Sequence, residues 1–154
     1  MNEFNLWLSG YLQRLATEFR TPPMKIKSKA LLASFPSAGC CENCGIPCSS
    51  RERHHIFSKG AGGPDIRCNI IMLGDAFTDQ CACHRLWHDG KIKREKFLDI
   101  VAKRERTTAA AIEDVINLVR RLPKNPSKAR LYGEISNLPD ASAILAMREL
   151  AEEL

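Results

Sequence analysis

The fold of this chain is decided by residues 41–88, which read CENCGIPCSSRERHHIFSKGAGGPDIRCNIIMLGDAFTDQCACHRLWH. All seven cysteines and all four histidines lie between positions 40 and 88, and the rest of the chain contains none. Buried core cysteines and histidines would be scattered over the whole chain, so this clustering indicates metal ligation. A disulfide framework is the alternative. The odd number of cysteines and the lack of a visible export signal argue against it.

The composition excludes several classes of protein. Hydrophobic residues make up 44% and charged residues 27% of the 154 residues, a balance typical of a globular chain. No segment approaches the roughly 20 apolar residues that span a bilayer, and the N-terminal residues lack the basic start and apolar run of a secretory signal. The net charge of +5 is compatible with a nucleic-acid partner. With the cysteines free to bind metal, we expect a reducing compartment, the cytoplasm.

The chain divides into three predicted regions. Residues 1–36 form an N-terminal helical segment, in which apolar residues at helical spacing predict a helix over 3–20. Residues 37–92 form a turn-rich, metal-binding core with two brief strands, at 55–57 and 69–73, and a helix that begins between 80 and 83. So small a core needs metal as well as apolar burial to hold together.

Residues 93–154 form the third region, which is helical. We expect one helix over 91–106, a second that Thr107 or Thr108 caps and that ends at Arg121, and an acidic helix over 140–154. Pro123 and Pro126 interrupt the second helix inside a basic stretch without acidic residues: Arg120, Arg121, Lys124, Lys128 and Arg130.

The histidines occur in two pairs with different geometry. His84 and His88 are four residues apart on the predicted helix, so their imidazoles share one face and can bind one ion. His54 and His55 are adjacent at a predicted strand, where successive side chains point to opposite sides. The two neighbours should therefore have different roles.

The cysteines predict a separate, structural zinc site. Cys41 and Cys44 have the spacing of a zinc knuckle, and we expect Cys83 to join them in a four-thiolate site. Cys81 is the favoured fourth ligand, with Cys68 or Cys48 as alternatives. We expect Cys40 to be a spare buried thiol.

The ordered set of His54-His55, Gly62-Gly63, Asn69 and a His84/His88 helix resembles the HNH (ββα-metal, or His-Me finger) endonucleases, of the phage type with a zinc knuckle. The resemblance implies an α+β fold: a small zinc-stabilised ββα-metal core flanked by N- and C-terminal helices. The chain departs from the family at Cys81-Ala-Cys83-His84, which is one residue shorter than the Cys-x-x-Cys-His of many members.

The resemblance also implies an activity, the metal-dependent hydrolysis of DNA phosphodiester bonds, one strand per active site. His54 would hold a catalytic Mg²⁺, Mn²⁺, Ni²⁺ or Zn²⁺ together with His84 and His88, although some members use the last position for phosphate contact. His55 would be the general base, since an imidazole exchanges protons near neutral pH. Asn69 would either join the metal or fix the loop that carries the base.

The implied partner is DNA, in double-stranded form, with no membrane, and a homodimer would allow both strands to be cut. The implied setting is the cytoplasm of a bacterial host, for a phage or prophage product. One alternative is a non-catalytic, zinc-dependent DNA-binding or regulatory module with the same fold. Another is a protein-interaction adaptor that docks through its acidic C-terminal helix. A purely structural zinc at His84 and His88 is a third, and it leaves His55 unexplained.

Overall fold

A computed structural model of the chain describes residues 31, 33–74, 80–151 and 154. The helix predicted over 3–20 lies outside these residues. The described elements are β1 (Gly39–Cys40), β2 (Pro47–Cys48), β3 (Arg51–His55), η1 (Lys59–Ala61), η2 (Arg67–Asn69), β4 (Ile70–Gly74), α3 (Cys83–His88), α4 (Arg94–Glu105), α5 (Ala109–Arg121), α6 (Lys128–Ser136) and α7 (Asp140–Glu149). The predicted α+β class is therefore confirmed.

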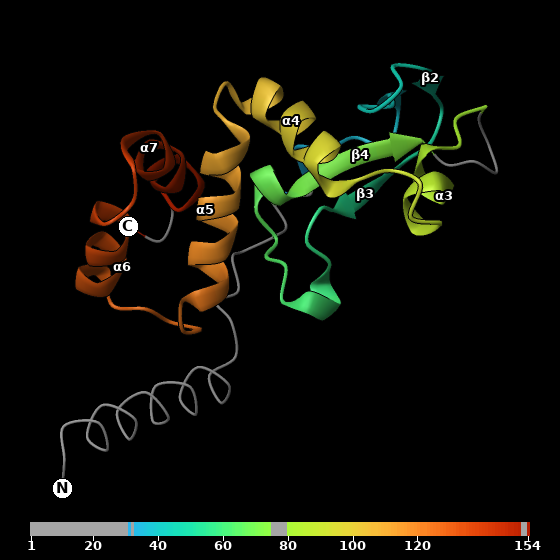
Figure 1. The fold of residues 1–154 in the computed structure, drawn as a ribbon. Helices are drawn as coiled ribbons and strands as arrows, with labels where there is room; N and C mark the ends of the chain where they lie inside the picture. The colour runs from blue at the N-terminus through green and yellow to red at the C-terminus, as the bar shows by residue number, and fades with distance from the viewer. Residues whose placement is uncertain (1–30, 32, 75–79, 152–153) are drawn as a thin grey trace, which may run out of the picture.

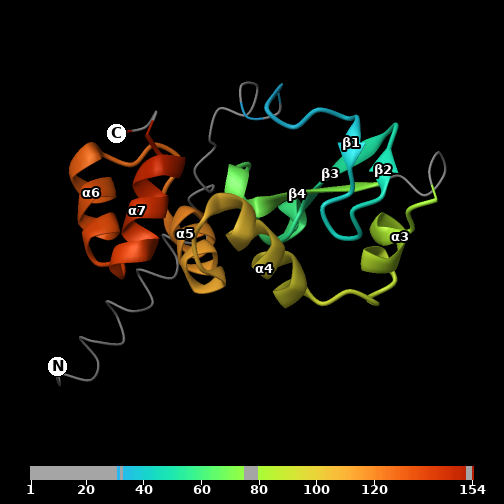
Figure 2. The same ribbon diagram turned by 90° about the horizontal axis from the view of Figure 1, so that it is seen from above.

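The elements are arranged along one long direction of the molecule. Helices α6 and α7 lie at one end, and the β1–β2 hairpin and α3 lie at the other (Figures 1 and 2). The β3–β4 pair, α4 and α5 lie between them. Among the described residues, no helix is long and apolar enough to cross a membrane.

The central hairpin positions the histidines. Strands β3 and β4 pair antiparallel, from Arg51 opposite Gly74 to His55 opposite Ile70, and every residue of β4 is buried. The two strands were predicted, but the first lies over 51–55 and not over 55–57. The ladder ends there because the backbone N–H of Phe57 donates to the Asn69 side chain, and the chain then turns into η1.

Helix α5 is the centre of the helical part. Its buried residues recur at helical spacing, so that it packs against α4 and against α7. The Thr108 hydroxyl accepts a hydrogen bond from the backbone N–H of Ala111 at 3.1 Å and caps the helix, as predicted. Trp87 of α3 packs against this core, with its ring centroid 4.8 Å from that of Phe97 and the two ring planes tilted by 33°.

The last two helices differ from the prediction. Helix α6 was not predicted, because Pro123 and Pro126 indicate a loop, yet Ser127 caps a helix that buries Leu131 and Ile135. Helix α7 starts at Asp140 as predicted and ends at Glu149, shorter than the expected 140–154.

One arginine connects the cysteine-rich end of the molecule to the helices. The Arg104 guanidinium on α4 donates to both carboxylate oxygens of Glu42, at 2.9 and 3.1 Å, and to Oε1 of Glu105 at 2.7 Å. It also donates to the backbone carbonyls of Ile70 and Arg67. Its side chain is only 18% exposed, and that of Glu105 is 6% exposed. These contacts tie the Cys41–Cys44 turn, β4 and η2 to α4.

We expect Arg104→Met to lower the free energy of unfolding by about 3 kcal/mol, because it removes a largely buried cation from the buried Glu105 carboxylate and from the half-buried Glu42 carboxylate. Urea denaturation of the metal-loaded protein measures this. Lys103→Met is the matched control: Lys103 is the exposed neighbour, and its loss should cost less than about 0.5 kcal/mol. Equal losses in the two variants would contradict the role assigned to Arg104.

Candidate metal sites

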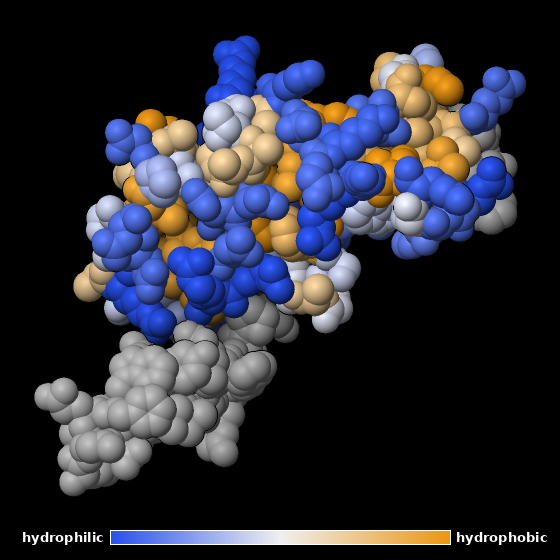
Figure 3. All heavy atoms as spheres, in the orientation of Figure 1, coloured by the Kyte–Doolittle hydropathy of each residue, from blue (hydrophilic) through white to orange (hydrophobic). Residues whose placement is uncertain are grey.

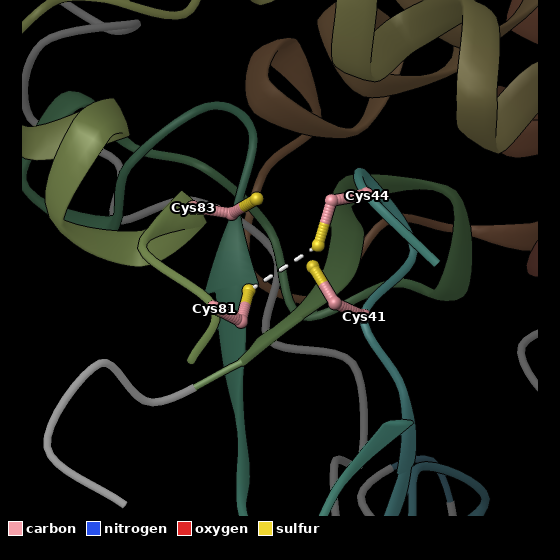
Figure 4. A group of neighbouring side chains, drawn as sticks. All are labelled: Cys41, Cys44, Cys81 and Cys83. Carbon is pink, nitrogen blue, oxygen red and sulfur yellow. Dashed lines mark hydrogen bonds between the residues drawn. The ribbon is translucent and has the colours of Figure 1, made fainter. Parts of the chain in front are cut away.

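Four cysteine sulfurs converge at one end of the molecule. The Sγ atoms of Cys41, Cys44, Cys81 and Cys83 all lie within 4.8 Å of one another, and those of Cys44 and Cys81 are 3.5 Å apart. Figure 4 shows the four side chains pointing toward a common centre, two from each segment of the chain. Four thiolates at about 2.3 Å from a tetrahedral Zn²⁺ would be about 3.8 Å apart. The donor set and its spacing therefore fit a structural zinc.

Local structure explains why these cysteines meet. Cys41 and Cys44 lie in the turn between β1 and β2, which is closed by a hydrogen bond from the Gly45 backbone N–H to the Cys41 carbonyl. Cys83 is the first residue of α3, and Cys81 lies just before it. Strand β4 ends beside them at Gly74, where a Cβ atom would lie 2.7 Å from the Cys81 sulfur. A glycine is needed here for the strand to reach the cluster.

The thiols of the cluster differ in acidity. Burial raises the pKa of Cys81 and Cys83, that of Cys83 to about 11. Burial also acts on Cys41, but hydrogen bonds from the backbone of Gly74, Cys44 and Asn43 outweigh it and lower its pKa to about 7. Packed, buried sulfurs of this kind are stabilised as thiolates by a bound cation.

Three imidazoles converge at a second place. One ring nitrogen from each of His54, His84 and His88 lies within 4.8 Å of the others, and the Nε2 atoms of His84 and His88 are 3.0 Å apart. His54 comes from β3, and the other two come from successive turns of α3. Burial and the neighbouring imidazoles lower the pKa of His54 to about 4, which leaves a neutral ring. Three imidazole nitrogens that converge in this way suit a transition-metal ion.

A carboxylate contacts the histidine group on the side of His84 that faces away from His88. Oε2 of Glu52 lies 3.3 Å from Nδ1 of His84, the ring nitrogen on the other side from His88. Glu52 and His54 are two residues apart on β3, so both project to the same side of the strand. A carboxylate on the far nitrogen of a metal-binding imidazole fixes its orientation and raises its basicity.

His55 lies apart from this group. Its Nε2 is 2.6 Å from Oδ1 of Asp65, and the Lys59 ammonium lies 3.4 Å from the same oxygen. Burial raises the pKa of the Asp65 carboxyl, but the hydrogen bond to His55 and the charge of Lys59 outweigh it and lower that pKa. The carboxylate is therefore ionised at neutral pH and accepts a hydrogen bond from the imidazole.

Asn69 holds the loop that carries Asp65. Its Nδ2 donates to the carbonyls of Phe57 and Pro64, at 3.1 and 2.9 Å, and its Oδ1 accepts from the Phe57 N–H at 2.9 Å. The side chain is completely buried. The loop is tight, since a Cβ at Gly63 would lie 1.6 Å from the Phe57 carbonyl oxygen. Of the two roles predicted for Asn69, these contacts favour fixing the loop.

The sequence-predicted residues thus fall into three places. The four favoured cysteines meet, and three histidines meet elsewhere. His55, at the end of β3, and Asn69, at the end of η2, each contact the loop between them. Cys48 and Cys68, the alternative ligands, are buried outside the cluster. Cys40 is exposed and not buried as expected, like its neighbour Gly39 in β1. Sequence reasoning missed the positions of Glu52 and Asp65, and strand alternation from His54 was the signal that could have found Glu52.

Comparison with models of protein families, with curated proteins and with solved structures finds no match to this chain. The arrangement of its own residues is therefore what carries a functional conclusion.

Proposed function

We propose that the chain is a metal-dependent endonuclease of the HNH type, which hydrolyses phosphodiester bonds of DNA. The observation that carries the proposal is the division of labour between two adjacent imidazoles. His54 joins His84 and His88 in a group that can hold a cation, while His55 is left out of that group and is paired with a carboxylate. A metal site that only stabilised the fold would not require His55 to be paired with a carboxylate outside the metal-binding group.

In this proposal the cysteine and histidine groups bind different ions. The four thiolates hold a structural Zn²⁺. The three imidazoles hold the catalytic ion, for which the family resemblance allows Mg²⁺, Mn²⁺, Ni²⁺ or Zn²⁺, and imidazole ligands favour the transition metals among these. Such an ion supplies charge stabilisation at the scissile phosphate and at the leaving oxygen.

His55 acts as general base, and Asp65 determines which nitrogen does so. Because the ionised Asp65 carboxylate contacts Nε2, that nitrogen carries the imidazole hydrogen, and Nδ1 keeps the free lone pair. Nδ1 takes a proton from a water molecule, whose oxygen attacks the phosphorus while the bond to the leaving 3′ oxygen breaks. Asp65 then stabilises the imidazolium, and Asn69 holds the loop in place for this contact.

A plasmid-nicking assay tests the proposal. We expect the zinc-loaded protein to convert supercoiled plasmid to the nicked form when Mn²⁺, Ni²⁺, Zn²⁺ or Mg²⁺ is added. The variant His84→Ala/His88→Ala removes two of the three imidazoles and should lose that activity, with its helical circular dichroism retained. DNA binding without cleavage under every metal would instead identify the non-catalytic DNA-binding module and overturn the nuclease assignment.

A further inference from the structure

The loop that follows His55 is flanked by cations from two helices. The Arg94 guanidinium carbon, at the start of α4, lies 4.2 Å from the centroid of the Phe57 ring. That of Arg120, near the end of α5, lies 5.6 Å from the same centroid. Phe57 itself is buried and only two residues from His55. Two helices that lie far from Phe57 in the sequence thus place positive charge beside the loop that follows His55.

Both arginines are exposed, and no carboxylate in the described part of the chain lies within ion-pair distance of either. The ring contact holds each planar group in place while most of its five N–H donors stay available. Arg120 donates from Nη2 to the carbonyl of Ala61, at 2.9 Å, which ties it to the same loop, and from Nη1 to Oδ1 of Asn117, at 3.5 Å. A fixed, unpaired and exposed guanidinium is well suited to bind a phosphate group.

The positive charge continues from Arg120 into the connection between α5 and α6. Between Asp114 and Glu134 the chain has five basic residues and no acidic one. Lys124, Lys128 and Arg130 are exposed, and of the five only Arg121 has an ion pair among the described residues, with Glu134 at 3.8 Å. In Figure 3 strongly hydrophilic side chains cover the lower end of α5 and this connection. The stretch therefore carries no carboxylate of its own, and the Glu134 carboxylate beside it is paired with Arg121.

We propose that Arg94 and Arg120 form a phosphate-binding pair that holds the backbone of double-stranded DNA beside the loop after His55, with the basic α5–α6 connection extending the same surface. The proposal rests on the proposed function for its choice of polyanion. It assigns to the C-terminal helices a part in substrate binding that the metal-binding core alone does not provide. Phosphate contacts of this kind bind without regard to base sequence and weaken steeply with salt.

The test is a fluorescence-anisotropy titration of a labelled 20-base-pair duplex at several salt concentrations. The full chain carries His55→Ala, so that cleavage cannot interfere with binding. We expect Arg94→Gln/Arg120→Gln to weaken binding about tenfold at low salt and to reduce the slope of log K against log salt by about 2, one for each lost phosphate contact. Arg94→Lys/Arg120→Lys keeps both charges and should keep most of that slope.

Lys103→Gln/Arg106→Gln is the matched control, because it removes two exposed charges at the opposite end of α4. It should leave the salt slope nearly unchanged. The proposal is overturned if the glutamine pair binds like its parent, if the control pair loses as much, or if the lysine pair loses affinity equally. If the parent protein nicks no plasmid but the glutamine pair still binds DNA more weakly than the control pair, the nuclease assignment is wrong and the DNA-binding surface is still supported.

Discussion

His55→Ala should reduce the rate of plasmid nicking by roughly 10²–10⁴-fold, the contribution of a positioned general base. The reason is the position of the ring. Its Nε2 is held by Asp65, and its neighbour His54 belongs to the cation-binding group, so no other imidazole can replace it. The rate is measured under single-turnover conditions with saturating metal.

The adjacent residue provides the control for this experiment. His54→Ala removes a ligand and should lower the affinity of the histidine site for Ni²⁺ or Zn²⁺, whereas His55→Ala should leave that affinity unchanged. Isothermal titration of the protein, with the cysteine site already filled, separates the two. If His55→Ala also loses the cation, or if it nicks at the parental rate, the assignment of His55 as base is wrong.

The second large effect concerns the cysteine cluster. Cys41→Ser should abolish tight zinc binding at this cluster and unfold the β1–β2 hairpin and α3, because structural zinc sites contribute on the order of 10 kcal/mol to small domains. The element lengths explain the dependence: β1 and β2 have two residues each, and α3 has six. Hydrogen exchange should show lost protection there and retained protection in α5 and α7, which share their own buried interface.

Cys40→Ser is the matched control for this variant. Cys40 is the neighbouring residue, but its side chain is exposed and its sulfur is not among the four that converge. Zinc content, measured by elemental mass spectrometry, should be parental in Cys40→Ser. An unchanged zinc content and an unchanged exchange pattern in Cys41→Ser would contradict the structural role of the cluster.

Local patterns explain what could be predicted from the sequence. The convergence of His84 and His88 follows from helical spacing, and that of Cys41 and Cys44 follows from knuckle spacing, because both depend on a few consecutive residues. Which cysteine completes the cluster, Cys81 rather than Cys48 or Cys68, depends on where β4 ends. The sequence favoured Cys81 but could not exclude the other two.

Other features depend on contacts that no local pattern records. Asp65 reaches His55 only because Asn69 folds the intervening loop, so spacing in the sequence does not reveal the pair. Helix α6 was missed because Pro126 was interpreted as a helix breaker. Pro126 instead lies just before Ser127, the residue that caps the start of α6. The first strand was placed too late because Ile56 and Phe57 are apolar, and their burial comes from the loop and not from strand pairing.

Cys83 and His84 are consecutive residues in the first turn of α3, and they belong to the two different groups of ligands. An ion at the thiolates would thus anchor the backbone from which the first imidazole projects. Occupancy of one centre becomes a precondition for tight binding at the other, and the two equilibria are linked by one shared helical turn. Because this linkage is reciprocal, loss of zinc from the thiolates would weaken binding of the second ion, and loss of the second ion would weaken binding of zinc.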